Sequence, residues 1–194
     1  MSSQKAKTLV YCVRHAEADN SVRDNMARPL TDAGFQAAES LVGVFAGIPV
    51  DYMYASPMLR AIQTLAPLAR AKGLGIPSCE GVREREIGTY VDDYDSFSRL
   101  QWENFQHKHE DGESLAETQT RAIQAIDSLV ALHAGKTIVI GTHGTALGTI
   151  RAAYDPAFGY EAFRETLPWL PYIVLLEFSE NNCERISLVP LDFK

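Results

Sequence analysis

The sequence predicts an α/β fold, a three-layer sandwich with a mostly parallel central sheet and an antiparallel hairpin at its C-terminal end. Apolar, β-branched runs occupy residues 8–13 and 137–141, as in strands that are buried on both faces of a parallel sheet. Other strand-like segments alternate with stretches that carry apolar residues at helical spacing, which is typical of layered α/β proteins. Because no internal repeat or flexible linker interrupts this alternation, we expect one domain over residues 1–194.

Capping residues and helix breakers delimit the elements of the first half. Thr31 is a preferred N-cap residue and precedes an expected helix over residues 33–45. Residues 51–55 are expected to form a short second strand. The next helix is expected over residues 57–72, with a proline in its first turn and Ser56 as its cap.

The second half is expected to contain one long helix among shorter elements. Ser114 and Glu117 form a capping-box pattern, which predicts the start of a helix that runs to about His133. The other expected elements, in order, are a short strand (77–80), a helical insertion over the site (92–109), a strand (137–141), a helix (146–154) and a hairpin (172–178 and 184–189).

Composition and charge exclude several classes of partner. The chain has 194 residues, 46% of them hydrophobic, and a formal net charge of −7, which argues against a nucleic acid or an anionic membrane as partner. The polar first residues resemble no secretory signal, and no apolar stretch is long enough to span a membrane. Because the three cysteines show no pairing pattern, we expect a reduced, cytoplasmic protein.

Two histidines follow the two most apolar strands. His15 comes directly after the first strand, beside Arg14, and His143 follows the strand at residues 137–141. Since ligands bind outside the carboxyl ends of parallel strands, we expect both histidines in one crevice. A neutral imidazole can attack phosphorus, and a neighbouring guanidinium lowers its pKa and holds phosphate oxygens. A structural histidine at a strand end explains this segment equally well.

Further segments carry groups suited to phosphoryl transfer. Arg60 lies near the start of the second expected helix and is expected to point over the same crevice, although a solvated arginine is the simpler interpretation. A phosphatase also needs a general acid, and spacing alone leaves Glu84 and Glu86 as equal candidates. Gly144 allows close backbone approach beside His143, and the helix that follows offers free N–H groups for a phosphate.

The sequence favours chemistry without a metal or any other cofactor. The only tight histidine cluster is His107 and His109 in the polar insertion, and residues two apart on a helix do not face each other. The chain also contains no HExxH pattern and no Cys/His zinc spacing.

Taken together, these segments resemble the histidine phosphatase superfamily, also called phosphoglycerate mutase-like. The resemblance covers the whole chain in order, with Arg14-His15, Ser56 to Thr64, Glu84 four residues before Gly88, and Thr142 to Gly144. It implies that His15 is the nucleophile, that Arg14 and Arg60 clamp the phosphate, that His143 stabilises charge, and that Glu84 is the proton donor and later the base.

Two positions depart from the family pattern. Ala16 replaces the usual glycine after the nucleophile, so its methyl group is expected to narrow the approach or to alter the backbone. The family often has an asparagine six residues after the nucleophile, whereas Asn20 sits one place early, which makes it a candidate phosphate-binding residue.

The resemblance implies a phosphomonoester phosphatase that acts on a small phosphorylated substrate through a phosphohistidine. Family mutases have a longer insertion and a closing tail, whereas this insertion is short and poor in cations, which favours hydrolysis. A cofactor-dependent phosphoglycerate mutase is the alternative, and a non-catalytic binding relative is a weaker one because all five catalytic positions are filled. A homodimer is compatible with the sequence.

Overall fold

A computed structural model describes residues 6–89 and 91–191 and contains one five-stranded sheet. The strands lie in the order β2-β3-β1-β4-β5, so that β1 pairs in parallel with β3 and antiparallel with β4. Their bounds are β1 Thr8–Arg14, β2 Tyr52–Ala55, β3 Thr137–Thr142, β4 Tyr172–Ser179 and β5 Asn182–Val189. The expected parallel core with a C-terminal antiparallel hairpin is thereby confirmed.

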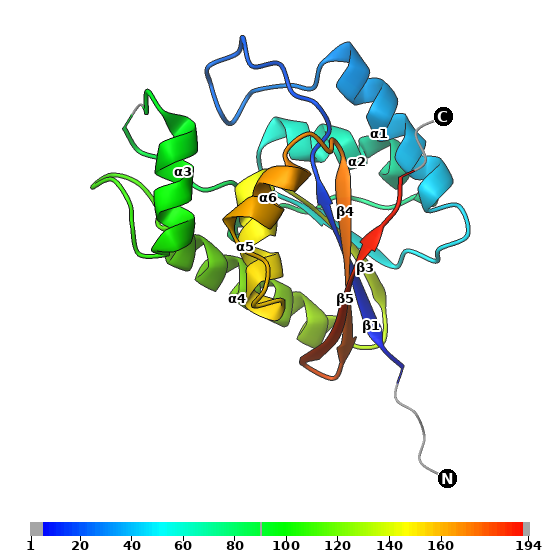
Figure 1. Cartoon of the computed structure of the whole chain (residues 1–194). Helices are drawn as coiled ribbons and strands as arrows, with labels where there is room; N and C mark the ends of the chain where they lie inside the picture. Colours follow the sequence, from blue (N-terminus) through cyan, green and yellow to red (C-terminus); the bar gives the residue numbers. More distant parts are fainter. Residues whose placement is uncertain (1–5, 90, 192–194) are drawn as a thin grey trace.

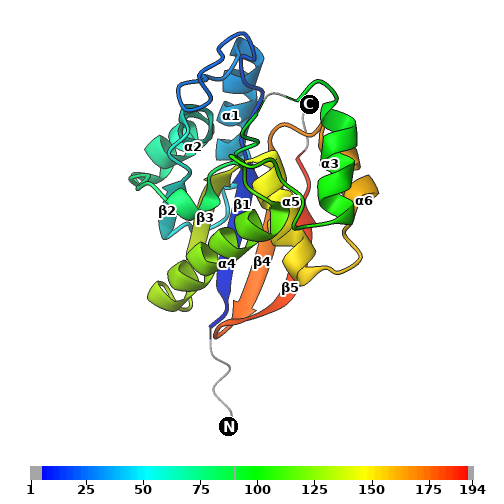
Figure 2. The same cartoon turned by 90° about the vertical axis from the view of Figure 1, so that its left-hand side faces the viewer.

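Helices cover both faces of this sheet. Helices α1 (Asp32–Val44) and α2 (Leu59–Lys72) lie on one face, and α4 (Leu115–Leu132) and α5 (Gly144–Tyr154) lie on the other (Figure 1). Two shorter helices, α3 (Tyr94–Glu103) and α6 (Tyr160–Thr166), lie together at the edge of the second helical layer (Figure 2). The three layers match the predicted sandwich.

Alternating side chains of β1 explain why its sequence is apolar throughout. Val10 and Cys12 pack against the layer of α4 and α5, whereas Tyr11 and Val13 pack against α1 and α2. Successive residues of a strand point to opposite faces, so a strand covered on both sides needs apolar residues at every position. Within the described part of the chain, no helix is long and apolar enough to cross a membrane.

The helix caps read from the sequence are present. The Thr31 side chain accepts a hydrogen bond from the Gly34 N–H at the start of α1. Ser114 and Glu117 form a reciprocal capping box at the start of α4.

Three expectations about elements are wrong. Residues 77–80 form a single bridge between Ala55 and Ser78 and then a 3-10 turn, η1 (Glu80–Val82), instead of a strand. Helix α2 begins after Met58, so Ser56 does not cap it. The sequence also did not predict α6, and the helical part of the insertion is shorter than expected.

Candidate active site

The carboxyl ends of β1 and β3 bring the two histidines together. In the β1–β3 ladder Arg14 lies opposite Thr142, so the residues that follow each of them emerge side by side. The rings of His15 and His143 are 5.2 Å apart between centroids. His15 lines a cavity of about 690 Å³, together with Arg14, Arg60 and Glu84.

A backbone carbonyl determines which nitrogen of His15 is free to react. His15 Nδ1 lies 2.7 Å from the carbonyl oxygen of Ala16. A carbonyl oxygen can only accept, so Nδ1 must carry the proton, and Nε2 of the neutral ring keeps its lone pair. Burial, helped by the charges of Arg60 and Arg14, lowers the pKa of His15 to about 3. His15 is therefore a neutral imidazole with Nε2 available.

His143 is completely buried and hydrogen-bonded through only one of its ring nitrogens. Its Nε2 lies 2.7 Å from the hydroxyl oxygen of Ser56, and its Nδ1 has no hydrogen-bond partner among the described residues. Burial, followed by the nearby His15 and arginine charges, lowers the pKa of His143 well below its usual value. Without a bound anion His143 is thus neutral, and a positive charge on it would require the phosphoryl group to be present.

Arg14 lies against the start of α5 and the end of α6. Its Nη1 donates to the carbonyl oxygens of Thr166 and Leu167, at 3.1 and 3.0 Å. A Cβ atom at Gly144 would lie 3.2 Å from Arg14 Nε and 3.3 Å from its Cζ. The absence of a side chain at Gly144 therefore leaves space for the Arg14 guanidinium. The sequence analysis had expected the phosphate, and not Arg14, to approach the backbone closely at this glycine.

Arg60 is the second residue of α2 and is only 4% exposed. Its Nη1 donates to the carbonyl oxygen of Asn25 at 2.7 Å. This bond connects Arg60 to the loop after β1, and Arg60 lines the cavity as expected. Because α2 begins at Leu59, Arg60 lies closer to the start of the helix than the sequence indicated.

The N-terminus of α5 holds the carboxylate of Glu84. Its two oxygens accept hydrogen bonds from the backbone N–H groups of Thr145 and Ala146, each at 3.1 Å. Two of the N–H groups that the sequence offered to a phosphate, those of Thr145 and Ala146, thus bind Glu84 in this structure. Glu86 instead forms an ion pair with Arg83 at 3.1 Å, and its side chain is 59% exposed. Of the two candidate acids, Glu84 is the one fixed beside the histidines.

Asn20 and one aromatic residue of the insertion are among the residues that line the cavity. Asn20 lies at the rim, where its Oδ1 accepts a hydrogen bond from Arg28 at 3.3 Å. Trp102 packs against Phe163 with ring centroids 4.9 Å apart, so it anchors α3 to α6. Tyr94 is the aromatic residue of the insertion that lines the cavity.

Comparison with known proteins then assigns the family. A family model described as the histidine phosphatase superfamily, branch 1, matches residues 10–184. The chain belongs to this superfamily. It is 28% identical over 154 residues to the probable phosphoglycerate mutase GpmB of Yersinia pestis (strain Pestoides F). This alignment covers 73% of this chain and 72% of the relative.

Solved structures of two phosphatases share the fold. Phosphoserine phosphatase from Entamoeba histolytica, solved with 3-phosphoglyceric acid, superposes with a TM-score of 0.76 at 20% identity, covering 95% of this chain and 98% of that one. Mycobacterial glucosyl-3-phosphoglycerate phosphatase gives a TM-score of 0.73 at 20% identity over 94% and 97% of the two chains. At these identities the likeness establishes the fold of this superfamily member.

Ala16 fits the site in place of the family's usual glycine. Its side chain packs with Leu30 and Ala38 and is completely buried. Its N–H donates to Thr64 Oγ1 at 2.9 Å. Among the described residues other than glycine, Glu180 is the one with positive φ, so the backbone at Ala16 needs no glycine. The methyl group of Ala16 therefore packs in the core, and Ala16 is not among the residues that line the cavity of His15.

Two residues with no local signal in the sequence, Arg121 and Glu113, hold the loop of Glu84. Arg121 on α4 donates to the carbonyl oxygens of Gly81 and Arg83, at 2.7 and 2.9 Å. Glu113 accepts hydrogen bonds from both Arg83 and Arg121. The structural role of Glu113 follows only from these long-range contacts.

Replacing Arg121 with lysine is expected to lower kcat about tenfold for phosphomonoesters with poor leaving groups and to leave KM nearly unchanged. A lysine keeps the charge but cannot reach two carbonyls and Glu113 at once, so the loop of Glu84 loosens. Steady-state kinetics with an alkyl and an activated aryl phosphate check this, and Arg70→Lys, on the exposed side of α2, serves as control. Equal losses in kcat with both substrates would contradict a role through Glu84.

The buried neutral His15 also predicts a pH-dependent stability. Its pKa is about 6.5 in the unfolded chain and about 3 when folded, so the unfolded state binds more protons between these values. The contribution of His15 to the free energy of unfolding is fully present above pH 6.5 and is lost as the pH falls towards 3, with a loss of about 3 kcal/mol at pH 4.5. Urea unfolding of the wild type and His15→Gln at pH 7 and 4.5 measures this difference. Equal acid-induced losses in the two proteins would refute it.

Proposed function

We propose that the chain is a metal-independent phosphomonoester phosphatase that acts on a small phosphorylated substrate through a phosphohistidine on His15. The observation that carries the proposal is the free Nε2 of neutral His15, in one cavity with two arginines and a fixed carboxyl group. An imidazole nitrogen that is kept unprotonated serves as a nucleophile and not as a proton donor. The superfamily membership supports the same assignment.

In the first step His15 Nε2 attacks phosphorus and the bond between phosphorus and the ester oxygen breaks. Arg14 and Arg60 neutralise the phosphoryl oxygens, whose charge is shared among them in the transition state. Glu84, protonated at this stage, gives its proton to the leaving oxygen, so an alcohol and not an alkoxide departs. His143 contributes a hydrogen bond from its one ring N–H to a phosphoryl oxygen.

In the second step water replaces the alcohol. The Glu84 carboxylate takes a proton from water, whose oxygen attacks phosphorus as the phosphorus–nitrogen bond breaks. The products are inorganic phosphate, neutral His15 and a protonated Glu84, so the cycle is complete. Arginine charge serves here where other phosphatases use metal ions, and among the described residues no group of three or more His, Cys, Asp or Glu side chains could hold one.

A phosphoglycerate mutase is the second candidate, because the relative from Yersinia pestis carries that name. A mutase must return the phosphoryl group to the bound intermediate and keep water away from it. Two residues that line the cavity here, Tyr94 and Glu86, are each more than a third exposed, so the cavity is in contact with solvent. That exposure to solvent favours transfer to water.

The deciding experiment mixes the protein with 3-phosphoglycerate and a trace of 2,3-bisphosphoglycerate, and follows isomer interconversion and phosphate release together. We expect phosphate release from a panel of phosphomonoesters, unaffected by dialysis against a chelator, with negligible interconversion. Efficient interconversion with little free phosphate would establish the mutase instead. Loss of activity on chelation, restored by a divalent ion, would refute the metal-independent mechanism.

We propose further that the protein works in the cytoplasm on a free small molecule, with neither nucleic acid nor membrane as partner. The net charge of −7 and the three free cysteines support this. Sedimentation of the purified protein tests whether it is a monomer or a homodimer.

A further inference from the structure

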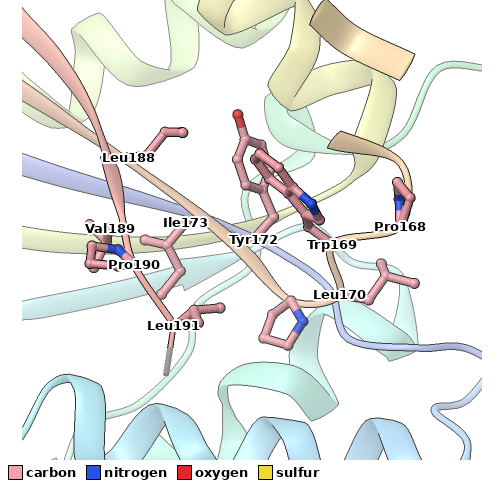
Figure 3. Close-up of a pocket in the computed structure, with 10 residues that line it drawn as sticks. Pro168, Trp169, Leu170, Tyr172, Ile173, Leu188, Val189, Pro190 and Leu191 are labelled. Carbon is pink, nitrogen blue, oxygen red and sulfur yellow. The ribbon is translucent and has the colours of Figure 1, made fainter. Parts of the chain in front are cut away.

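A second cavity, of about 620 Å³, lies between the α6–β4 connection and the end of β5. We call it the apolar groove, because every residue that lines it is apolar or aromatic. Figure 3 shows Trp169 and Leu170 on one side and Leu188 and Leu191 on the other, with Ile173 on the side of the two leucines of the C-terminal segment. Trp169 and Leu188 are 45% and 46% exposed, so two large side chains of the groove are in contact with solvent.

The apolar groove begins where the phosphate site ends. Leu170 lines both cavities. Arg14 pairs with Tyr172 in the β1–β4 ladder, and its guanidinium contacts the carbonyl oxygens of Leu167 and Trp169, at 3.0 and 3.5 Å. The arginine next to the nucleophile is therefore held by the same segment that forms one wall of the groove.

The two neighbouring cavities differ in chemical character. The cavity of His15 is lined by four arginines, Arg14, Arg28, Arg60 and Arg85, which suit an anion. The apolar groove carries no charged residue in its lining and has the size of a small-molecule site. A ligand that extends across Leu170 would place a charged end and an apolar end in matching surroundings.

We propose that the apolar groove binds the alcohol portion of the substrate, and that the natural substrate is a phosphomonoester of an alcohol with an apolar chain or ring. This proposal rests on the phosphatase function proposed above. The phosphoryl group lies at His15, and the apolar portion passes Leu170 towards Ile173 and Leu188. Burial of this portion stabilises the bound substrate through the hydrophobic effect.

A series of 4-alkylphenyl phosphates, from methyl to pentyl, tests the proposal. A para-alkyl group hardly changes the acidity of the phenol, so a change in kcat/KM along the series reports binding. We expect kcat/KM to rise about two- to fourfold for each added methylene. Inhibition constants of alkylphosphonates of increasing length, measured in parallel, should improve by a similar factor.

Leu188→Ser is the diagnostic variant, because Leu188 lies on edge strand β5 and its exposed side chain can be replaced without a cavity in the core. The ratio of kcat/KM for the pentyl and methyl substrates should fall about tenfold or more. Leu132→Ser, at the end of α4 and 70% exposed, is the matched control and should keep the wild-type ratio.

Each alternative outcome has a distinct signature. A flat series in an active wild-type enzyme would overturn the groove proposal and leave the phosphatase function standing. If no substrate is hydrolysed, the proposal of a phosphatase function is refuted. If the phosphonate affinities are then also independent of chain length, the proposed role of the apolar groove is refuted as well. A dimer that Leu188→Ser dissociates, with the length dependence unchanged, would assign the groove to a second copy of the chain.

Discussion

Replacing His15 with glutamine is expected to abolish turnover, with kcat at least about ten-thousandfold lower for every phosphomonoester. Glutamine has similar size and polarity, but its amide nitrogen has no lone pair that can attack phosphorus. The arginines and Glu84 remain in place, so phosphate and phosphonates should still bind with affinities close to those of the wild type. Initial rates with an aryl phosphate and calorimetric titration with phosphate measure these two quantities.

A trapped intermediate gives a second measure of the same prediction. Acid-labile, base-stable label should accumulate on wild-type protein quenched during turnover of a ³²P-labelled substrate, and peptide mapping should place it on His15. The matched control is His133→Gln, at the opposite end of the sheet, where the imidazole pairs with the Tyr54 hydroxyl at 2.8 Å. Label at His143, or an active His15→Gln, would overturn the assignment of the nucleophile.

Replacing Glu84 with glutamine is expected to reduce activity according to the leaving group. Alkyl phosphates need a proton on the departing oxygen, so their turnover should fall about 10²- to 10⁴-fold. An activated nitrophenyl phosphate needs little protonation, so its first step should survive. Because Glu84 is also the base for the attacking water, the second step then becomes limiting, and a burst of nitrophenol should precede slow turnover.

Rapid-mixing kinetics with both substrates tests this prediction, and Glu86→Gln is the control. Glu86 is exposed and ion-paired with Arg83, so its replacement should change neither rate by more than a few-fold. Glutamine at position 84 can keep the bonds from Ala146 and Arg85 but loses the one from Thr145, so thermal unfolding of the variant should be compared as well. Equal losses for both substrates would assign the acid to Glu86 or Glu17.

The sequence predicted the elements whose signals are local. The continuous apolar runs of β1 and β3 arise because both faces of these strands are buried, and that pattern is visible without any structure. Caps such as Thr31 and Ser114 act within a single turn, so the starts of α1 and α4 were predicted correctly. The order of the strand-end residues likewise identified the family before the fold was known.

Other elements could not be predicted because distant contacts decide them. Residues 77–80 look like a strand, but the chain turns into η1 after one bridge, beside the contact of Gly81 with Arg121 on α4. Helix α6 is short, and its stability comes from Phe163 packing on Trp102 of the insertion and not from its own sequence pattern.

For the site, the sequence by itself determined which residue types meet at the carboxyl edge of the sheet, because strand order and periodicity place His15 and His143 there. Only the tertiary structure decided how each group is poised. The family resemblance selected Glu84 over Glu86, but the way the Glu84 carboxylate is held depends on N–H groups of α5, some sixty residues away in the chain. The free Nε2 of His15 depends on the direction of one carbonyl, and its lowered pKa depends on burial. Hydrogen-bond direction and desolvation are properties of the packed molecule and leave no signal in a linear sequence.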